Sequence, residues 1–401
     1  MRERVFITGC GIASPLGCGF GEFCASLEGG MRGTDRITCF NTSHFPVASG
    51  GEARRGGQVI KTDSGTDRKA LLANIALDEL MASSGHCIRS YAREKRVMSL
   101  GAGIDHFDLP GYVRSSERKM GNWRPYSPRA TVAARVLAER AEVSGGLCLN
   151  VAACVASAQA MGLAFRIVSS SPDTVAISGG FDSMLSPMHY MGFYKLGALS
   201  EAADSSRACK PFSKNRAGLV IGEGAALFTI ENARNAKPSS ILAEIAGYAS
   251  SMDAATVTDP DPDGRALARA ALEAIGMAGL SPDDIDCAHL HETGTIKNAV
   301  AEASAMRLVF GRRASDIPVF SLKGQTGHLI GACCAVETAA VIHCLQTQTV
   351  LPTVNFEEPD PQVPLCVVTE RPRRMKINNV LKLNAAFGGQ NAAIVFKKYE
   401  P

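Results

Sequence analysis

Four segments of the sequence carry side chains whose types and settings could do chemistry together. Cys154 begins an Ala-, Ser- and Gly-rich segment in which the apolar positions 158, 161, 165 and 168 recur at helical spacing. A cysteine at a helix N-terminus faces free N–H groups and the positive end of the helix dipole, which favour the nucleophilic thiolate. The sequence has thirteen cysteines, so a buried structural thiol is the alternative for this one.

Two histidines follow predicted strands. His291 comes directly after the apolar strand 285–290, and the carboxyl ends of strands are where α/β sheets place their sites. His328 follows the strand 318–322 and a glycine-punctuated turn that also contains Lys323, so both side chains can face one cavity. The alternatives are a partly buried structural histidine, a histidine that caps a helix, and a solvated lysine.

The fourth segment is Phe387-Gly388-Gly389, which lies between the two closing strands. Paired glycines adopt backbone conformations closed to other residues, so their N–H groups can turn inward and form an anion cradle. A simple tight turn is the alternative.

Strands that alternate with helices position these four segments. The pattern predicts a buried α/β sheet on each side of a polar stretch at 232–240, which we take as the boundary between domains 1–236 and 237–401. Both domains show the same βα pattern, although no residue-level repeat establishes a duplication. The predicted helices are 68–83, 130–140, 265–276, 299–310 and 331–346, and the predicted strands are 4–8, 97–100, 174–178, 225–230, 241–247, 285–290, 318–322, 380–383 and 392–396.

Composition excludes several classes of protein. The 401 residues are 46% hydrophobic and carry a net charge of +3, which excludes a disordered chain and gives no footprint for nucleic acid. No Cys-x-x-Cys pair occurs, so we expect neither a zinc site nor a disulfide framework. The sequence shows no signal peptide and no run of about 18 apolar residues, which predicts a soluble cytoplasmic protein without a membrane partner.

Taken together and in this order, the segments resemble the elongating 3-oxoacyl-[acyl-carrier-protein] synthases, the beta-ketoacyl synthase I/II type of condensing enzyme in the thiolase superfamily. The resemblance covers nearly the whole chain. It rests on residues 5–17, 40–46, 67–68, 153–154, 179–180, 208–212, 218–224, 291–295, 323–328 and 387–389.

The resemblance implies the thiolase fold, an α/β fold of two related βαβαβαββ halves packed as a five-layer αβαβα sandwich. By motif, the nucleophile falls on Cys154, the two catalytic histidines on His291 and His328, and the catalytic lysine on Lys323. Phe387 takes the place of the substrate gate, and backbone N–H groups of Cys154 and Phe387 would hold an oxyanion. The residues with an expected supporting role are Thr293, Thr295, Glu302, Gly388 and Gly389. The resemblance implies no metal and no other cofactor.

The reaction of the family is a decarboxylative Claisen condensation. An acyl group on the cysteine joins malonyl-[acyl-carrier protein] and gives a 3-oxoacyl chain two carbons longer, in fatty-acid or type II polyketide biosynthesis. The implied partner of this acyltransferase is an acyl carrier protein with phosphopantetheine-linked acyl and malonyl groups. The implied assembly is a homodimer, with a heterodimer as the alternative. The alternative functions are a chain-length subunit of a condensing heterodimer and a chain-initiating malonyl decarboxylase.

The sequence departs from the family pattern close to these residues. Glu292 stands where glycine is usual, Ala299 stands where an aspartate is common, and Cys333-Cys334 replaces Ala and Gly. Residues 324–325 and 383–386 are also altered. The departures make a specialised acyl substrate an alternative to primary fatty-acid elongation.

Two other enzyme classes fit the residues less well. A thiolase needs a second cysteine near the C-terminus, and the last cysteine, Cys366, lies outside any glycine-rich motif. A cysteine hydrolase would share a cysteine and a histidine, but not the second histidine with its lysine turn.

Overall fold

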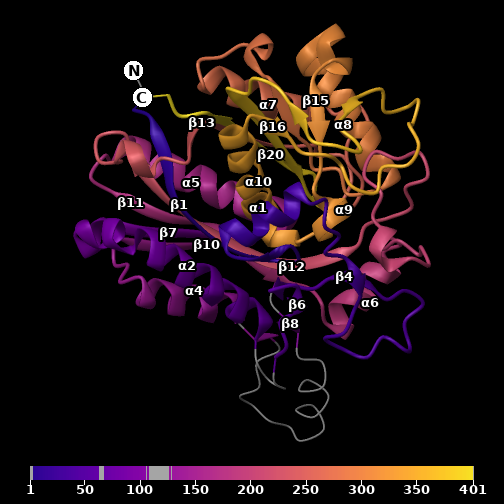
Figure 1. Ribbon diagram of the computed structural model, residues 1–401, viewed down its shortest axis with the longest axis horizontal. Helices are drawn as coiled ribbons and strands as arrows, with labels where there is room; N and C mark the ends of the chain where they lie inside the picture. Colours follow the sequence, from indigo (N-terminus) through magenta and orange to yellow (C-terminus); the bar gives the residue numbers. More distant parts are fainter. Residues whose placement is uncertain (1–2, 63–66, 105, 108–125, 128, 401) are drawn as a thin grey trace, which may run out of the picture.

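Two similar sets of strands and helices follow each other along the chain (Figure 1). The computed structural model describes residues 3–62, 67–104, 106–107, 126–127 and 129–400. The main strands of the first set are β1 (Val5–Ser14), β7 (Arg96–Gly101), β10 (Gly146–Asn150), β11 (Val175–Ser183) and β12 (Ile221–Asn232). Its helices are α1 (Phe20–Glu28), α2 (Arg68–Ser90), α4 (Arg129–Arg140), α5 (Ala156–Ser170) and α6 (Pro187–Lys195).

The second set begins after residue 242. Its main strands are β13 (Ala243–Met252), β14 (Cys287–His289), β15 (Pro318–Phe320), β19 (Asn379–Ala385) and β20 (Gln390–Lys397), and its helices are α7 (Arg265–Met277), α8 (Ile296–Phe310), α9 (Lys323–Thr326) and α10 (Cys333–Thr347). The short strands are β2 (Gly17–Cys18), β3 (Asp35–Arg36), β4 (Ser49–Gly51), β5 (Arg54–Arg55), β6 (Gln58–Val59), β8 (His106–Phe107), β9 (Tyr126–Ser127), β16 (Thr349–Val350), β17 (Cys366–Val367) and β18 (Arg373–Arg374).

Each set arranges its five main strands in the same spatial order. Counted along the chain, the order is third, second, fourth, fifth, first: β10-β7-β11-β12-β1 in the first set and β15-β14-β19-β20-β13 in the second. The fifth strand of each set is antiparallel to both neighbours, and the second strand is parallel to both of its neighbours. β1 also pairs with β13 over Val5–Ile7, which joins the two sheets. The shared topology confirms the predicted fold of two related halves.

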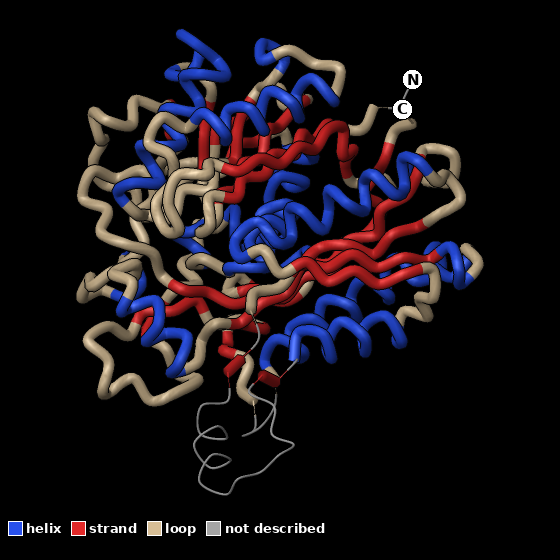
Figure 2. Tube along the Cα trace, turned by 180° about the vertical axis from the view of Figure 1, so that it is seen from behind, coloured by secondary structure: helices blue, strands red, loops and turns tan. Residues whose placement is uncertain are grey.

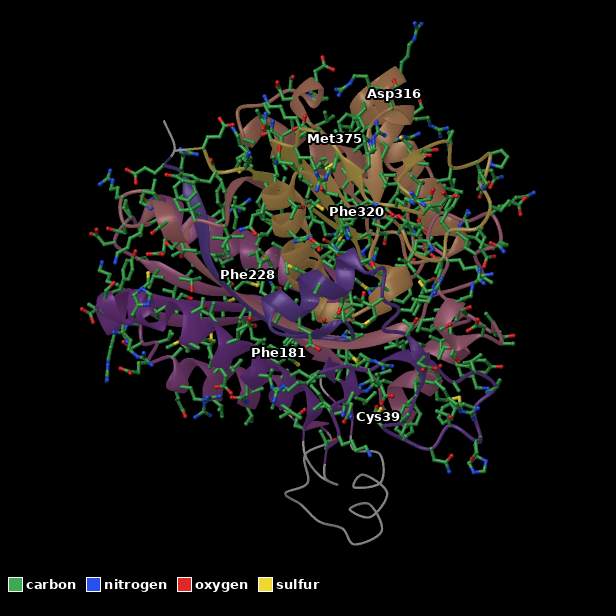
Figure 3. All side chains as sticks on the ribbon, in the orientation of Figure 1. Cys39, Phe181, Phe228, Asp316, Phe320 and Met375 are labelled. Atoms are coloured by element: carbon green, nitrogen blue, oxygen red, sulfur yellow. The ribbon has the colours of Figure 1, made fainter. Side chains whose placement is uncertain are left out.

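Five layers result from packing these elements (Figures 1 and 2). Helices α2 and α4 cover the outer face of the first sheet, α7 and α8 cover the outer face of the second, and α5 and α10 lie between the two sheets. Three aromatic side chains labelled in Figure 3 mark these layers: Phe181 packs in the outer core of the first sheet, whereas Phe228 and Phe320 pack in the central core. The central layer therefore contacts both sheets.

The position of α5 and α10 between the sheets explains their apolar sequences. Residues 333–345 of α10 are all buried, so this helix has no face for solvent. By length and hydropathy, residues 153–170 and 330–347 are apolar enough to span a membrane, but 61% and 89% of these two segments are buried inside the protein. We therefore assign both segments to the core of the fold.

Most predicted elements coincide with observed ones to within a few residues, including the helix that follows Cys154. Two differ. The strand β10 was not predicted, and Lys323, expected in a turn, opens the one-turn helix α9. The polar stretch at 232–240 connects β12 to β13, but because β1 pairs with both strands the structure defines no cut there. The division into domains 1–236 and 237–401 stays a prediction.

Candidate active site

Cys154 lies in a short 3-10 turn, η2 (Ala153–Val155), between the end of β10 and the start of α5. Ala153 has a φ of 47°, in the left-handed region that is costly for a residue with a side chain. Strained residues of this kind are concentrated at active sites. The turn places the Cys154 side chain, which is only 5% exposed, in the wall of a cavity of about 340 Å³.

The C-terminal half brings both predicted histidines to this thiol. Nε2 of His328 is 3.0 Å from Sγ of Cys154, and the rings of His291 and His328 meet edge to face with their centroids 5.1 Å apart. One nitrogen of each histidine and Sγ of Cys154 all lie within 4.8 Å of one another. The three side chains therefore form one cluster to which both halves of the chain contribute.

The hydrogen bonds of His328 fix its tautomer. Its Nδ1 accepts from the backbone N–H of Ile330 at 3.3 Å, and Sγ of Cys333 lies 2.8 Å from the same nitrogen. A backbone N–H can only donate, so Nδ1 carries no proton and Nε2 does. Burial and then Lys323 lower the pKa of His328 to about 3, so the ring stays neutral. His328 therefore presents an N–H donor at the sulfur.

His291 is held in the same tautomer by different partners. Its Nδ1 lies 3.3 Å from Nδ2 of Asn384 and 3.4 Å from Nζ of Lys323. Both groups are donors, so the proton of the neutral ring is on Nε2. Burial, followed by Lys323 and His328, holds the pKa of His291 well below its usual range. The cavity is thus lined by two neutral imidazoles that each carry the proton on Nε2, and in His328 this N–H faces the sulfur of Cys154.

A buried ion cluster lies behind the histidines. Nζ of Lys323 is 2.5 Å from Oε1 of Glu337, and Nζ of Lys382 is 2.7 Å from Oε2 of the same carboxylate. Burial raises the pKa of Glu337, but the two lysines outweigh it and hold that pKa well below its usual range. Burial lowers the pKa of Lys323, but Glu337 outweighs it and that pKa ends above its usual range. Lys323 therefore stays an ammonium and is no general base.

The surroundings of the Cys154 thiol act on its ionisation in opposite directions. Burial raises its pKa to about 12, whereas Lys323 and the backbone N–H groups of Phe387 and Cys154 act in the opposite direction. Burial therefore opposes the thiolate that the helix N-terminus favours, and the expected thiolate stays a prediction. The two N–H groups nevertheless converge on the sulfur, where an oxyanion formed beside it would meet them.

A sulfur and two imidazoles are also ligands that zinc accepts. Here, however, the ammonium of Lys323 lies 3.4 Å from His291 and stays charged because Glu337 binds it. A divalent cation among the three side chains would be repelled by this fixed charge. The electrostatics of the cluster favour an anion over a metal ion.

The remaining wall of the cavity mixes hydroxyl and apolar groups. Thr293 and Thr295 both line it, and their hydroxyl oxygens are 2.8 Å apart. Leu196 and Ile296 line it as well and are 58% and 61% exposed, so they mark its opening. The exposed ion pair of Lys297 and Asp259 lines the cavity too, so the buried cluster is connected with solvent through a mouth that has both apolar and charged side chains.

Glu302 supports the His291 loop from behind the cavity wall. Its fully buried carboxylate accepts the backbone N–H groups of His291 at 2.6 Å and Glu292 at 2.7 Å, and Nδ2 of Asn298 at 2.8 Å. Burial and then the charge of Glu292 raise the pKa of Glu302 to about 8. The glutamate at position 292 thus places a second carboxylate beside the first.

The turn of Phe387, Gly388 and Gly389 joins β19 to β20 at the cavity. Phe387 is half-buried and lines the cavity, whereas the two glycines do not. Gly388 and Gly389 have φ values of 84° and 73°, a region that favours glycine. The N–H of Gly388 donates to the carbonyl of Val257 at 2.7 Å, and Gly389 accepts from the N–H of Asp253 at 2.8 Å. The turn is therefore fastened to the loop that follows β13.

Models of known families match both parts of the chain. The beta-ketoacyl synthase N-terminal domain matches residues 2–236, and the beta-ketoacyl synthase C-terminal domain matches residues 242–357. The chain belongs to the beta-ketoacyl synthase family. A curated relative, 3-oxoacyl-[acyl-carrier-protein] synthase 2 of Synechocystis sp., is 31% identical over 100% of this chain and 99% of its own length.

Solved structures share the fold of this beta-ketoacyl synthase. A type II polyketide synthase acyl-carrier protein in complex with its ketosynthase, bound to the hexaketide, matches with a TM-score of 0.87 at 27% identity, over 100% of both chains. The ishigamide ketosynthase/chain length factor matches with a TM-score of 0.85 at 27% identity, again over 100% of both chains. These likenesses confirm the thiolase-type α/β architecture.

Three buried residues of this beta-ketoacyl synthase site were not predicted: Glu337, Lys382 and Asn384. A charged residue inside an apolar run is the signal that could have found two of them, since Glu337 lies within the buried part of α10 and Lys382 lies within β19. A buried charge needs a partner. The partner cannot be identified from the sequence, because the three residues come together only when the chain folds.

Cys366, the cysteine on which a thiolase mechanism would depend, lies on β17 away from this site. It is partly exposed and is absent from the wall of the cavity. Its Sγ accepts from the guanidinium of Arg373 at 3.6 Å. All thirteen cysteines of the chain are free thiols.

Proposed function

We propose that this chain is an acyltransferase that condenses an acyl group held on Cys154 with malonyl-[acyl-carrier protein], with loss of CO₂. The observation that carries the proposal is the cluster of Cys154, His291 and His328, in which Nε2 of His328 lies 3.0 Å from the sulfur and a nitrogen of His291 lies within 4.8 Å of both. A nucleophile beside two neutral donors suits a reaction that makes an acyl thioester and then a negatively charged oxygen. The name of the Synechocystis relative supports the same chemistry.

Acyl loading is the first half-reaction. Sγ of Cys154 attacks the carbonyl carbon of a carrier-bound acyl thioester, the bond from that carbon to the carrier sulfur breaks, and the thiol proton leaves with the carrier thiol. The backbone N–H groups of Cys154 and Phe387 stabilise the tetrahedral oxyanion. Since burial opposes ionisation of the thiol, the two oxyanion donors lower the barrier to loading where the charge develops.

Decarboxylation and condensation follow in the same cavity. The bond from the malonyl α-carbon to its carboxylate breaks, CO₂ leaves, and the electron pair forms an enolate whose oxygen accepts from Nε2–H of His291 and His328. The carbanion then attacks the acyl carbonyl carbon, the bond from that carbon to Sγ of Cys154 breaks, and the thiolate that leaves takes up a proton from water. Since loss of CO₂ creates the carbanion, no base is needed, and Lys323 can serve as a fixed charge that holds His291.

Phe387 acts as the gate of the cavity in this proposal. It is half-buried, it lines the cavity, and it is followed by two glycines whose conformations other residues rarely adopt. Gly388 and Gly389 are hydrogen-bonded to the loop after β13, so a movement of the turn would also move that loop. Thr293, Thr295 and Glu302 support the histidine loop behind the gate.

The partner is an acyl carrier protein in this proposal, and the assembly is a homodimer. Strand β10 has one neighbour, β7, among the described strands, so its other edge is open. Leu147 on this strand is 40% exposed and Val151 just after it is 51% exposed. A second copy of the chain would cover both the edge and these side chains. A heterodimer is the alternative, because one solved relative is a ketosynthase/chain length factor.

The setting proposed for this reaction is the cytoplasm, in fatty-acid or polyketide-type biosynthesis. The two segments that are apolar enough to span a membrane are mostly buried in the core, which supports a soluble enzyme. The likeness to a polyketide ketosynthase and the altered residues around the histidines support a specialised acyl substrate. The retained Cys154 speaks against a chain-length subunit that lacks a nucleophile.

The test is to incubate the purified protein with acyl-carrier-protein thioesters of increasing chain length and to follow intact mass. We expect one class of acyl group to appear on Cys154 and to be consumed when malonyl-carrier protein is added. The matched control is Cys154→Ala, which should carry no adduct. A folded protein that acquires no adduct from any primer but releases CO₂ from malonyl-carrier protein would instead be a chain-initiating decarboxylase.

A further inference from the structure

Glu337 binds two buried lysines, although one would balance its charge. The side chains of Lys323 and Lys382 are 0% exposed and that of Glu337 is 4% exposed, so solvent screens none of the three. Lys382 comes from β19, in which every residue is buried. An ammonium is costly to bury and persists only where hydrogen bonds satisfy it. The second lysine therefore needs an explanation beyond neutralising Glu337.

Lys382 has three hydrogen-bond acceptors, one for each of its protons. They are the carbonyl oxygen of Leu383 at 2.8 Å, Oδ1 of Asn384 at 2.9 Å, and Oε2 of Glu337 at 2.7 Å. An ammonium has no acceptor, so the amide atom of Asn384 that faces it must be the oxygen. The NH₂ group of Asn384 is thereby turned the other way. It lies 3.3 Å from Nδ1 of His291 and 3.2 Å from Oε2 of Glu337.

This orientation determines what His291 can do. With the NH₂ group of Asn384 on one side and the ammonium of Lys323 on the other, Nδ1 of His291 meets only donors and must accept. The imidazole proton is then on Nε2, the position that can face a substrate oxygen. Rotating the amide of Asn384 by half a turn would offer its oxygen to Nδ1 and move the proton there.

We propose that Lys382 is a positioning residue, which through Asn384 holds His291 in the tautomer that donates to the enolate oxygen. The proposal rests on the proposed function and deepens it by naming what prepares one of its two donors. Lys382 acts at a distance, since it touches neither the cavity nor Cys154. Its charge also helps to keep His291 neutral.

Because Lys382 is charged, the proposal also predicts a change in the pKa of His291 when this lysine is removed. Burial holds the pKa of His291 well below its usual range, with Lys323, His328 and Lys382 acting in the same direction and Glu337 against them. Removing Lys382 removes one positive charge, so the pKa of His291 rises. The titratable groups around His291 are Cys154, Glu302, Lys323, His328, Glu337 and Lys382.

The first experiment compares Lys382→Met with Lys376→Met in the full-length protein. Lys376 is exposed and lies six residues earlier, so it controls for the loss of a lysine. Acyl loading of Cys154 and CO₂ release from malonyl-carrier protein are measured separately over a range of pH. We expect Lys382→Met to slow CO₂ release about tenfold, as loss of a partner that orients a histidine typically does. We expect acyl loading to fall by only about threefold.

The pH profile separates positioning from general damage. When the rate of CO₂ release is plotted against pH, the fall in rate on the acid side should move to higher pH by about half a unit in Lys382→Met. It should stay in place in Lys376→Met. A merely structural loss would lower the rate at all pH values without moving this fall. The proposal would be overturned if Lys382→Met folds, releases CO₂ as fast as Lys376→Met and shows the same dependence on pH.

A second variant keeps the test decisive if Lys382→Met does not fold. Asn384→Asp preserves the shape of the side chain and its acceptor for Lys382, but it replaces the NH₂ donor at His291 by an acceptor. We expect the His291 proton to move to Nδ1 and CO₂ release to fall about a hundredfold. Unchanged CO₂ release by the folded variant would contradict the proposal.

A measurement without turnover separates this proposal from the proposed function. In protein labelled with ¹⁵N-histidine, the ring nitrogens of His291, assigned with His291→Asn, should show protonation at Nε2 in the wild type and at Nδ1 in Asn384→Asp. A wild type with the expected tautomer but no acyl adduct would refute the proposed function alone. A wild type that condenses while His291 is protonated at Nδ1 would refute the role of Lys382 alone.

Discussion

The two halves of the molecule share one strand order but differ in the charges that they place beside the cavity. The N-terminal half supplies Cys154 at the start of α5, a helix whose buried residues are all uncharged. The C-terminal half supplies α10, a more deeply buried helix whose Glu337 binds two lysines. In the proposed reaction, one half thus provides the nucleophile, and the other provides fixed charges and donors that stabilise negative oxygen.

The largest effect should come from removing the contribution of the N-terminal half. Cys154→Ala should abolish acyl loading and lower condensation by at least about a thousandfold, because Cys154 is the only cysteine among the described residues that line the cavity. Malonyl decarboxylation should persist, since its donors belong to the C-terminal half. Intact mass follows loading, and CO₂ release follows decarboxylation. Equal loss of all three activities in folded protein would contradict this separation of roles.

Removing the charge at the centre of the C-terminal half should mainly cost stability. Glu337→Gln leaves two buried ammonium groups without a counter-charge, and we expect the free energy of unfolding to fall by about 3 to 5 kcal/mol. Urea denaturation measures the change. The control is Glu357→Gln, whose partly exposed carboxylate pairs with Lys210 at 2.8 Å and should contribute less than about 1 kcal/mol. Equal losses in the two variants would show that the buried cluster contributes no more to the free energy of unfolding than an exposed ion pair does.

Removing the donor His328 should slow the two half-reactions to different extents. His328→Ala should slow malonyl decarboxylation by a factor of about 100 to 1000, the usual cost of losing an oxyanion donor, and should slow acyl loading about tenfold. Single-turnover assays of each half-reaction measure the split, with the exposed His44→Ala as control. A variant that loads poorly but decarboxylates normally would assign His328 to the nucleophile instead.

The smallest effect concerns His289, which is buried in the C-terminal half. Neither of its ring nitrogens has a hydrogen-bond partner among the described residues, and burial followed by Lys382 holds its pKa well below the usual range. Because the unfolded chain takes up a proton below about pH 6.5 and the folded protein does not, stability falls as the pH drops from that value.

His289→Leu should therefore stabilise the protein by about 1 kcal/mol at neutral pH, since it removes two unpaired polar atoms. The advantage should grow toward about pH 5.5, because one buried histidine fewer opposes protonation. Urea denaturation at both pH values tests this against His86→Leu, a change at an exposed histidine. A constant difference between the two pH values would show that His289 is not kept neutral.

The sequence alone could predict which side chains meet at the candidate site and the alternation of strands and helices. Cys154, His291, His328 and Lys323 stand in local patterns that the family motifs identify, and the structure brings all four together. Local sequence does not specify the strand order. Strand β12 pairs between β1 and β11 because of the packing of the whole half.

The state of the reactive groups could not be predicted, because it depends on burial and on distant partners. A helix N-terminus suggested a thiolate at Cys154, but desolvation raises its pKa to about 12. The tautomer of His291 depends on Asn384, and the orientation of Asn384 depends on Lys382. These residues lie about 90 positions after His291, so spacing gives no signal of their contact.

The place of β1 in the sheet has a consequence for synthesis on the ribosome. This first strand is almost wholly apolar and completely buried, and it pairs with β12 and β13, whose paired residues start at Ala225 and Ala243. At roughly 5 to 20 residues per second, about 10 to 40 s pass before the ribosome has made the first of these partners. During that time the open edges of an apolar strand are available to other chains. A nascent chain of this protein is therefore a natural client for chaperones until its second half begins to emerge.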